Sequence, residues 1–207
     1  MNRPVVPDEL RTERLLLRRW RPADAAELRP VLAANVEHLK PWIPWRVAEP
    51  VDVDKLAERL AEFSAAFDDA HEWRYGIFSA ETSAVLGELS LFPRSARGRV
   101  SFDAANEIEI GYWIRADATG QGLVTEAARA AMNVVLGLLS IRRLTIRCDE
   151  RNMASTAIPG RLGFRLTGVL AESTGRIQIW AYEGPSLPAA PPRATLDANS
   201  REESGHE

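Results

Sequence analysis

The amino-acid sequence predicts a protein of the α+β class, in which antiparallel strands and helices form one domain. Apolar residues recur every three or four positions between 52 and 70, as in a helix, and every second position from 72 onward, as in strands. The strand-like runs between 72 and 114 follow one another without a helix, which favours antiparallel pairing. A chain of 207 residues that is 45% apolar can bury one substantial core.

The first third of the chain is expected to hold one strand and two helices. Short apolar runs flanked by charge are typical of strands, and apolar residues spaced by three or four are typical of helices. Pro41 and Pro44 exclude a regular helix between the two expected helices. The expected elements are a strand at 14–20, a helix from 22 to about 35, an irregular segment at 39–45 and a helix at 52–70.

The middle of the chain is expected to be mainly strand. The expected elements are a hairpin of strands at 73–78 and 85–92, a polar loop at 93–105 with Arg94, Arg97 and Arg99, and a strand at 106–114. Side chains alternate between the faces of a strand. The last strand therefore places Glu107, Glu109 and Gly111 on one face, and Ile108, Ile110 and Tyr112 on the other.

The second half begins with a glycine turn that leads into a helix. The expected elements are this turn and helix at 118–136, a strand at 143–148, a short helix opened by Asn152, and a last pair of strands at 163–169 and 176–182. After Gly184 the composition changes to proline, alanine and charge. We therefore expect one domain at 1–183 and a disordered tail at 184–207.

Composition excludes several classes of function. The formal net charge of −3 argues weakly against a nucleic-acid-binding protein, although 24 of the 26 basic residues are arginine. The single cysteine, Cys148, excludes a disulfide framework, and His38, His71 and His206 lack metal-ligand spacing, so no metal is expected. The sequence shows neither a signal peptide nor a long apolar run, so we expect a cytoplasmic protein that binds no membrane.

The glycine turn is the strongest local signal of chemistry. Gly120 and Gly122 stand between a strand and a helix, where backbone N–H groups can cradle a pyrophosphate, and Thr125 could add a hydroxyl. No Lys-Ser/Thr pair follows, so this is not a P-loop. The third glycine of a dinucleotide-binding turn is also missing, which makes a nicotinamide cofactor an unfavoured ligand.

The motifs taken together resemble the GCN5-related N-acetyltransferases (GNAT), and most of all their RimJ/RimL-like branch, which acetylates the N-termini of ribosomal proteins. The resemblance runs from Leu10 to Tyr182 and depends on the order and spacing of several short segments. These segments are 10–15, 109–114, the glycine turn at 119–124, Asn152-Met-Ala-Ser155 and Arg161-Leu-Gly-Phe164.

The resemblance implies a mixed, mostly antiparallel sheet that splits in a V at its centre, is flanked by helices, and admits acyl-CoA into the gap. The turn would bind the pyrophosphate through its amides, the end of the preceding strand would face the pantetheine arm, and Asn152 would hydrogen-bond that arm. The implied residues that bind acetyl-CoA, the acyl donor substrate, are Trp113, Ile114, Gly120, Gln121, Gly122, Leu123, Val124, Thr125 and Asn152.

Two residues are candidates for proton transfer. Glu109 is the candidate base, acting through water, with Glu107 as the second choice; either could equally be an ordinary solvated carboxylate. The RimL-like branch places a serine three residues after the asparagine as the acid for the thiolate, which implies Ser155 here. Asn152 could also be a plain helix N-cap. Trp42 and Trp45 would form a wall of the acceptor pocket, or else a core plug.

The resulting hypothesis is an N-acyltransferase that moves an acetyl group from acetyl-CoA to a primary amine, on a protein N-terminus or a small molecule, by direct attack in a ternary complex. Its partners would be acyl-CoA and the amine, without nucleic acid, and a homodimer is compatible with it. The alternatives are the same fold using succinyl-CoA or another acyl-CoA, or a non-catalytic module that binds CoA or a partner.

Overall fold

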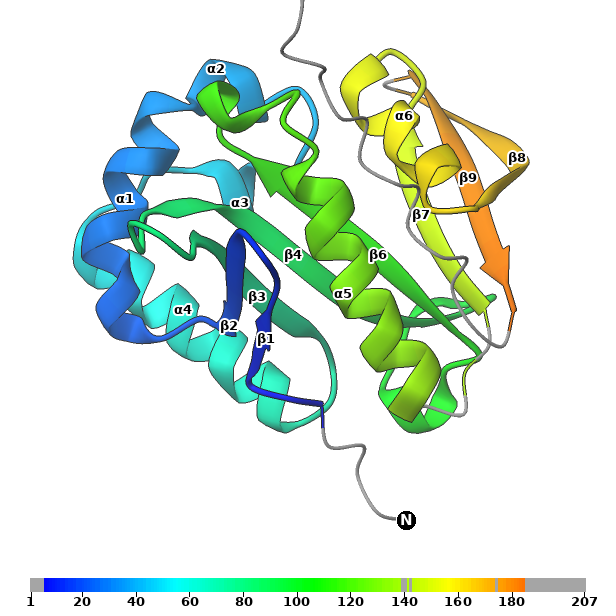
Figure 1. Cartoon of the computed structure of the whole chain (residues 1–207), viewed down its shortest axis with the longest axis horizontal. Helices are drawn as coiled ribbons and strands as arrows, with labels where there is room; N and C mark the ends of the chain where they lie inside the picture. Colours follow the sequence, from blue (N-terminus) through cyan, green and yellow to red (C-terminus); the bar gives the residue numbers. More distant parts are fainter. Residues whose placement is uncertain (1–5, 139–140, 142, 174, 185–207) are drawn as a thin grey trace, which may run out of the picture.

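The computed structural model describes residues 6–138, 141, 143–173 and 175–184 (Figure 1). A nine-stranded sheet forms its centre, with the strand order β1-β2-β3-β4-β6-β7-β9-β8 and with β5 paired to β4. The strands are β1 (Glu9–Arg11), β2 (Leu15–Arg19), β3 (Trp73–Ser79), β4 (Val85–Ser95), β5 (Gly98–Arg99), β6 (Glu107–Ile114), β7 (Arg143–Asp149), β8 (Arg165–Glu172) and β9 (Gly175–Glu183). The expected α+β class with a mostly antiparallel sheet is confirmed.

Six α-helices are found in the described part of the chain. They are α1 (Ala25–Ala34), α2 (Val36–Leu39), α3 (Trp45–Ala48), α4 (Val53–Asp68), α5 (Leu123–Leu138) and α6 (Met153–Arg161). Short 3-10 turns occupy Pro22–Asp24 (η1), Phe102–Ala104 (η2) and Ala116–Ala118 (η3). None of the helices in these ranges is both long and apolar enough to span a bilayer.

Most of the expected elements are confirmed, and one is wrong. The residues expected as a polar loop at 93–105 instead continue β4 to Ser95 and add the short strand β5. Arg94 can remain in a strand because β6 supplies a carboxylate to pair with it: Arg94 Nη1 lies 2.7 Å from Glu109 Oε2. The sequence also gave no sign of β1, which pairs with β2. The expected tail beyond Gly184 lies outside the described residues.

The sheet splits between β6 and β7, its one parallel pair among the described strands. These strands pair only at Ile108 with Leu144 and at Glu109 with Thr145. β6 nevertheless stays paired with β4 as far as Ile114, and β7 stays paired with β9 as far as Asp149. The two facing edges therefore leave the ladder together, which forms the expected V and exposes backbone groups that need other partners.

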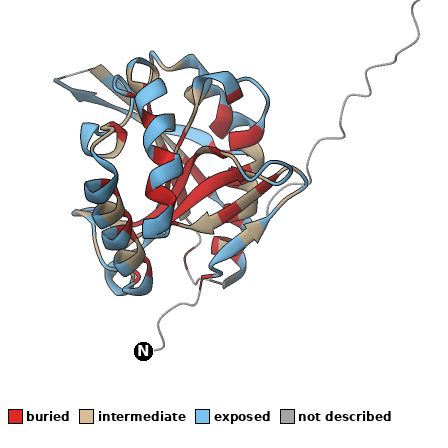
Figure 2. Ribbon diagram, turned by 90° about the vertical axis from the view of Figure 1, so that its left-hand side faces the viewer, coloured by how far each residue is buried: buried red, intermediate tan, exposed pale blue. Residues whose placement is uncertain are grey.

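Strand β6, at the edge of the split, contributes to two apolar cores. Ile108 and Ile110 belong to the core under α5, whereas Trp113 belongs to the core with α1 and α4. Since successive side chains point to opposite faces of a strand, these cores lie on opposite sides of the sheet. The expected alternation of β6 is thereby confirmed. Figure 2 shows the buried residues concentrated on the strands and on the helix surfaces that face them.

A buried polar network ties the second core to the sheet. The Glu88 carboxylate, 4% exposed, accepts hydrogen bonds from Trp20 Nε1 at 2.9 Å, Arg74 Nη1 at 2.7 Å and Ser90 Oγ at 2.9 Å. The Arg74 guanidinium also lies 4.3 Å from the centre of the Phe63 ring of α4. Because a buried charge is costly without partners, each member of this network depends on the others.

Replacing Arg74 with alanine is expected to lower the free energy of unfolding by about 3–5 kcal/mol, because it leaves the Glu88 carboxylate buried without its ionic partner. Urea denaturation measures the change. Arg11→Ala is the control, since this side chain is 71% exposed and pairs with Glu9 at the surface, where a pair contributes less than about 1 kcal/mol. Equal effects of the two substitutions would contradict the importance of the buried network.

Candidate active site

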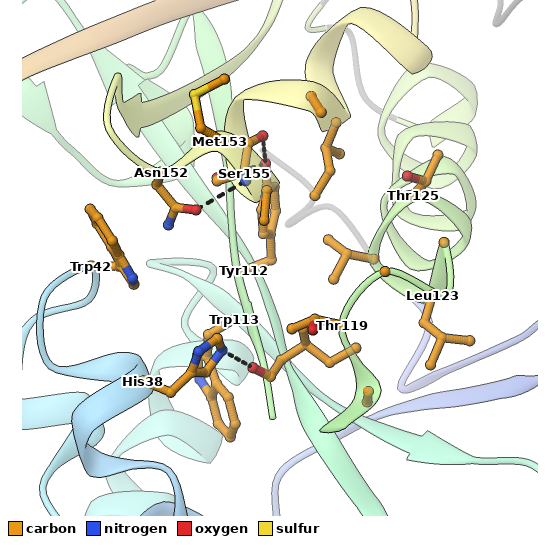
Figure 3. Close-up of a pocket in the computed structure, with 18 of the residues that line it drawn as sticks. His38, Trp42, Tyr112, Trp113, Thr119, Leu123, Thr125, Asn152, Met153 and Ser155 are labelled. Atoms are coloured by element: carbon orange, nitrogen blue, oxygen red, sulfur yellow. Dashed lines mark hydrogen bonds between the residues drawn. The ribbon is translucent and has the colours of Figure 1, made fainter. Parts of the chain in front are cut away.

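A cavity of about 400 Å³ lies at the open end of the split (Figure 3). Four parts of the chain line it: the segment from α2 to Ile43, the end of β6, the glycine turn with the start of α5, and the first half of α6 with Arg161. The volume falls in the range of small-molecule sites in proteins. The fold thus brings segments that are far apart in sequence around one space.

The glycine turn forms the side of the cavity below α5. Gly120 and Gly122 have φ values of +74° and +75°, a left-handed conformation that side chains rarely adopt. A Cβ built on Gly120 would meet no heavy atom within 4 Å, so the turn is open on that side. The first N–H groups of a helix lack partners within it, and its dipole is positive there. This geometry suits the binding of a phosphate through main-chain amides.

Side chains from the connection between β1 and β2 hold the glycine turn in place. Glu126, in the first turn of α5, accepts hydrogen bonds from Thr12 Oγ1 at 2.5 Å and from Arg14 Nε at 2.7 Å. Arg14 Nη1 also donates to the carbonyl of Gln121 at 3.0 Å. Burial would raise the pKa of Glu126, but the hydrogen bonds from Thr12 and Arg14 outweigh it, so the pKa lies below its ordinary value.

The α6 side of the cavity carries Asn152 and Ser155. Asn152 Oδ1 accepts a hydrogen bond from the backbone N–H of Ser155 at 3.1 Å, so the expected N-cap is confirmed. Ser155 Oγ donates to Tyr112 Oη at 3.2 Å, and Tyr112 Oη donates to the carbonyl of Ser155 at 3.2 Å. These bonds join β6 to α6 across the split. Burial raises the pKa of Tyr112 above its ordinary value, so its hydroxyl stays protonated.

A smaller cavity of about 70 Å³ lies where β6 and β7 diverge, and Tyr112 and Ser155 line it as well. Cys148 of β7 is another of its lining residues. Burial raises the pKa of the Cys148 thiol to about 11, against smaller opposing effects of hydrogen bonds with Ser155 and Trp180. The thiol is therefore protonated at neutral pH, which disfavours a role as nucleophile.

The segment around α2 forms the remaining wall. His38 Nε2 lies 3.1 Å from the carbonyl oxygen of Ile114, the last residue of β6. Trp42 is 39% exposed and lines both cavities, whereas Trp45 is 44% exposed and lines neither. The exposure of both rings is too high for a core plug. Of the two tryptophans, Trp42 alone is placed to contact a ligand.

Glu107 and Glu109 lie away from both cavities. Glu109 Oε2 is 2.7 Å from Arg94 Nη1 and 3.2 Å from Arg147 Nε, and Glu107 Oε2 is 3.0 Å from Arg143 Nε. Neither carboxylate is among the described residues that line the cavities. Both stand on the sheet face of Trp113, in a row of ion pairs that runs across the strands.

The structure therefore gathers most of the expected site residues but not all of them. Those that line the larger of the two cavities at the split are Trp42, Trp113, Ile114, Gly120, Gly122, Leu123, Val124, Thr125, Asn152 and Ser155. Those that do not are Trp45, Glu109 and Gln121. Among the lining residues that sequence reasoning did not name as site residues, three have titratable side chains: His38, Tyr112 and Arg161. Strand alternation could have indicated Tyr112, whereas the spacing of His38 carries no signal. Within the described ranges, no three His, Cys, Asp or Glu residues cluster as metal ligands do.

Comparison with known proteins gives a consistent result. A family model described as an acetyltransferase (GNAT) domain matches residues 14–165. The chain is similar to the probable N-acetyltransferase YjcK of Bacillus subtilis, with 24% identity over 157 residues, 76% of this chain and 83% of that protein. It is also similar to the ribosomal protein uS5-alanine N-acetyltransferase of Escherichia coli, with 29% identity over 159 residues, 77% of this chain and 79% of that protein.

Solved structures share the fold. A RimL ribosomal-protein acetyltransferase in complex with coenzyme A superposes with a TM-score of 0.73 at 21% identity. The match covers 87% of this chain and 98% of that one. The two proteins therefore have the same overall fold.

Replacing Glu126 with glutamine is expected to cost about 1.5 kcal/mol of stability at pH 7, because the ionised carboxylate loses its charge-assisted hydrogen bonds. Since its folded pKa lies below the ordinary value of 4.5, this contribution is present above pH 4.5 and is lost as the pH falls through the folded pKa. The two proteins should therefore converge in stability in acid, as measured by urea unfolding at several pH values. Glu58→Gln, on the exposed side of α4, is the control. A constant difference down to pH 3 would refute the argument.

Proposed function

This chain belongs to the acetyltransferase (GNAT) family, in its RimJ/RimL-like branch, and we propose that it transfers an acetyl group from acetyl-CoA to a primary amine by direct attack in a ternary complex. The amine would belong to a protein N-terminus or to a small molecule. One observation carries the proposal: a single cavity connects the glycine turn of α5 with Asn152 and Ser155 of α6, at the split between β6 and β7. Such a cavity offers phosphate-binding amides at one side and hydroxyl groups at the other.

The residues present fit an acyl-CoA donor. The amides from Gly120 to Thr125 would hold the pyrophosphate, and the Arg161 guanidinium on the same cavity supplies a cation for a phosphate group. Asn152 uses its Oδ1 for the N-cap, which leaves its Nδ2 group as a donor to the pantetheine amides. Thr119 Oγ1 donates to the carbonyl of Ala116 at 2.7 Å, so this side chain braces the turn.

The chemistry requires a nucleophilic amine, donors for the oxyanion and a proton for the leaving sulfur. The backbone N–H groups of Tyr112 and Ile114, on the edge of β6 that has left the ladder, are the proposed oxyanion donors. Ser155 is the proposed source of the sulfur's proton: its hydroxyl hydrogen, which Tyr112 Oη accepts in this structure, would turn to the sulfur. The base role of Glu109 stays a prediction; its ion pairs with Arg94 and Arg147 hold it outside both cavities.

The decisive experiment incubates the purified protein with acetyl-CoA and follows thiol release across a panel of amines. The panel should contain peptides with free N-termini, amino acids and polyamines, and calorimetry should measure CoA binding in parallel. Turnover with at least one amine class supports the proposal. A protein that neither binds CoA nor releases thiol would refute it. Replacing acetyl-CoA by succinyl-CoA in the same assay tests the alternative donor, because an extra carboxylate needs its own cation.

Replacing Ser155 with alanine is expected to lower kcat by about 10²-fold, because the thiolate then leaves without a positioned proton donor. The dissociation constant of CoA should change little, since the N-cap bond uses the backbone N–H of Ser155 and not its hydroxyl. Thr156→Ala is the matched control: this neighbouring hydroxyl donates to the carbonyl of Met153 and does not line the cavity. Comparable losses of kcat in both variants would argue against a specific role of Ser155.

A further inference from the structure

The larger cavity contains a titratable side chain that the proposed function has not used. His38 is half-buried and reaches the cavity from α2. No aspartate or glutamate is among the described residues that line this cavity, and its other polar side chains are hydroxyls, an amide, indoles and the Arg161 guanidinium. Histidine is the side chain whose ordinary pKa suits proton transfer near neutral pH. His38 is therefore the one proton acceptor of this kind among the described lining residues.

The partner of His38 fixes its tautomer. The carbonyl oxygen of Ile114 can only accept a hydrogen bond, so His38 Nε2, 3.1 Å away, must carry the hydrogen. In the neutral ring Nδ1 then holds the lone pair. Within the described part of the chain no hydrogen bond occupies Nδ1. A carbonyl that accepts from one nitrogen also stabilises the ring when the other nitrogen gains a proton.

His38 also lies at the end of the cavity where β6 ends, near the proposed oxyanion donors. Its partner, Ile114, is the last residue of β6, and Tyr112 two residues earlier is bonded to Ser155. Figure 3 shows His38 on the α2 side of the end of β6, and Asn152 and Ser155 on the α6 side. A base and an acid on different sides of the same strand end would flank a group bound there. This is the arrangement that an acyl transfer between two substrates requires.

We propose that His38 is the general base of the transfer, with Nδ1 taking the proton of the attacking amine while Nε2–H stays bonded to the carbonyl of Ile114. This inference rests on the proposed function. The neutral amine forms the C–N bond, and the C–S bond breaks with its electron pair leaving on sulfur. The nitrogen's proton passes to Nδ1, the sulfur takes a proton from Ser155 or water, and the imidazolium returns its proton to that donor through solvent. An amide and a thiol result, with protons balanced.

The other acidic and basic groups near the split are less suited to this task. Asp149 lines only the smaller cavity, and hydrogen bonds from Arg151 lower its pKa to about 2, which makes it a weak base. Glu109 lies outside both cavities, against Arg94 and Arg147. Of the two candidate bases, His38 lines the cavity, whereas Glu109, which the sequence indicated, does not.

The test compares three substitutions at two histidines in the acetyl-CoA assay. His38→Gln keeps an N–H donor for the carbonyl of Ile114 but removes the base, and it is expected to lower kcat by about 10²-fold with CoA binding retained. His38→Ala should lose a similar amount, and added imidazole should restore part of its turnover. His71→Gln is the control, since His71 is exposed beyond the end of α4 and should leave turnover unchanged.

Each outcome decides the proposal. Loss of turnover in both His38 variants, with CoA affinity and thermal melting like the wild type and rescue by imidazole, supports it. A His38→Gln variant that is as active as the wild type overturns it and makes His38 a structural hydrogen-bond donor. A Glu109→Gln variant is measured in the same assay, and a loss confined to it overturns the proposal in favour of that carboxylate. A wild-type protein that binds CoA but acetylates no amine overturns the proposed function, and the base role with it.

Discussion

The separation of β6 from β7 after two paired positions is the constraint on which the site depends. Two strand edges leave the ladder inside the molecule, where unpaired backbone groups are costly. The chain bridges the gap with hydrogen bonds between Tyr112 and Ser155 and leaves a cavity on either side of this bridge. Because the glycine turn follows β6 and α6 follows β7, both binding segments begin at the open end of the split.

The rest of the fold serves to hold this open end in position. The Glu126 carboxylate and the Arg14 guanidinium lock the glycine turn to the N-terminal strands, while His38 contacts the end of β6 from the other side. On the far face, the network of Glu88 and Arg74 joins the sheet to α4. Polar bonds of this kind are directional, so they fix positions that apolar packing alone would leave adjustable.

Several arginines have a structural role on the sheet face opposite α5. Arg94 and Arg147 flank Glu109, and Arg99 lies 3.5 Å from the ring centre of Phe92 and 3.6 Å from Glu72. These cations neutralise carboxylates of neighbouring strands and are not free for a ligand's phosphate. An anionic donor would instead meet the amides of the glycine turn, which is why a net charge of −3 is compatible with binding one.

Local patterns were enough to establish helices α1, α4, α5 and α6, most strands, the glycine turn and the N-cap at Asn152, because periodicity, φ and capping depend on neighbouring residues. Ser155 and Trp113, which the resemblance of the short motifs named, both line the cavity. Local patterns could not show that Arg94 and Arg147 hold Glu109 away from it, or that His38 meets a carbonyl 76 positions further on. The alternation of a strand shows on which face each side chain lies, but the partners of that side chain come from other strands and helices. Those contacts exist only once the whole sheet is assembled.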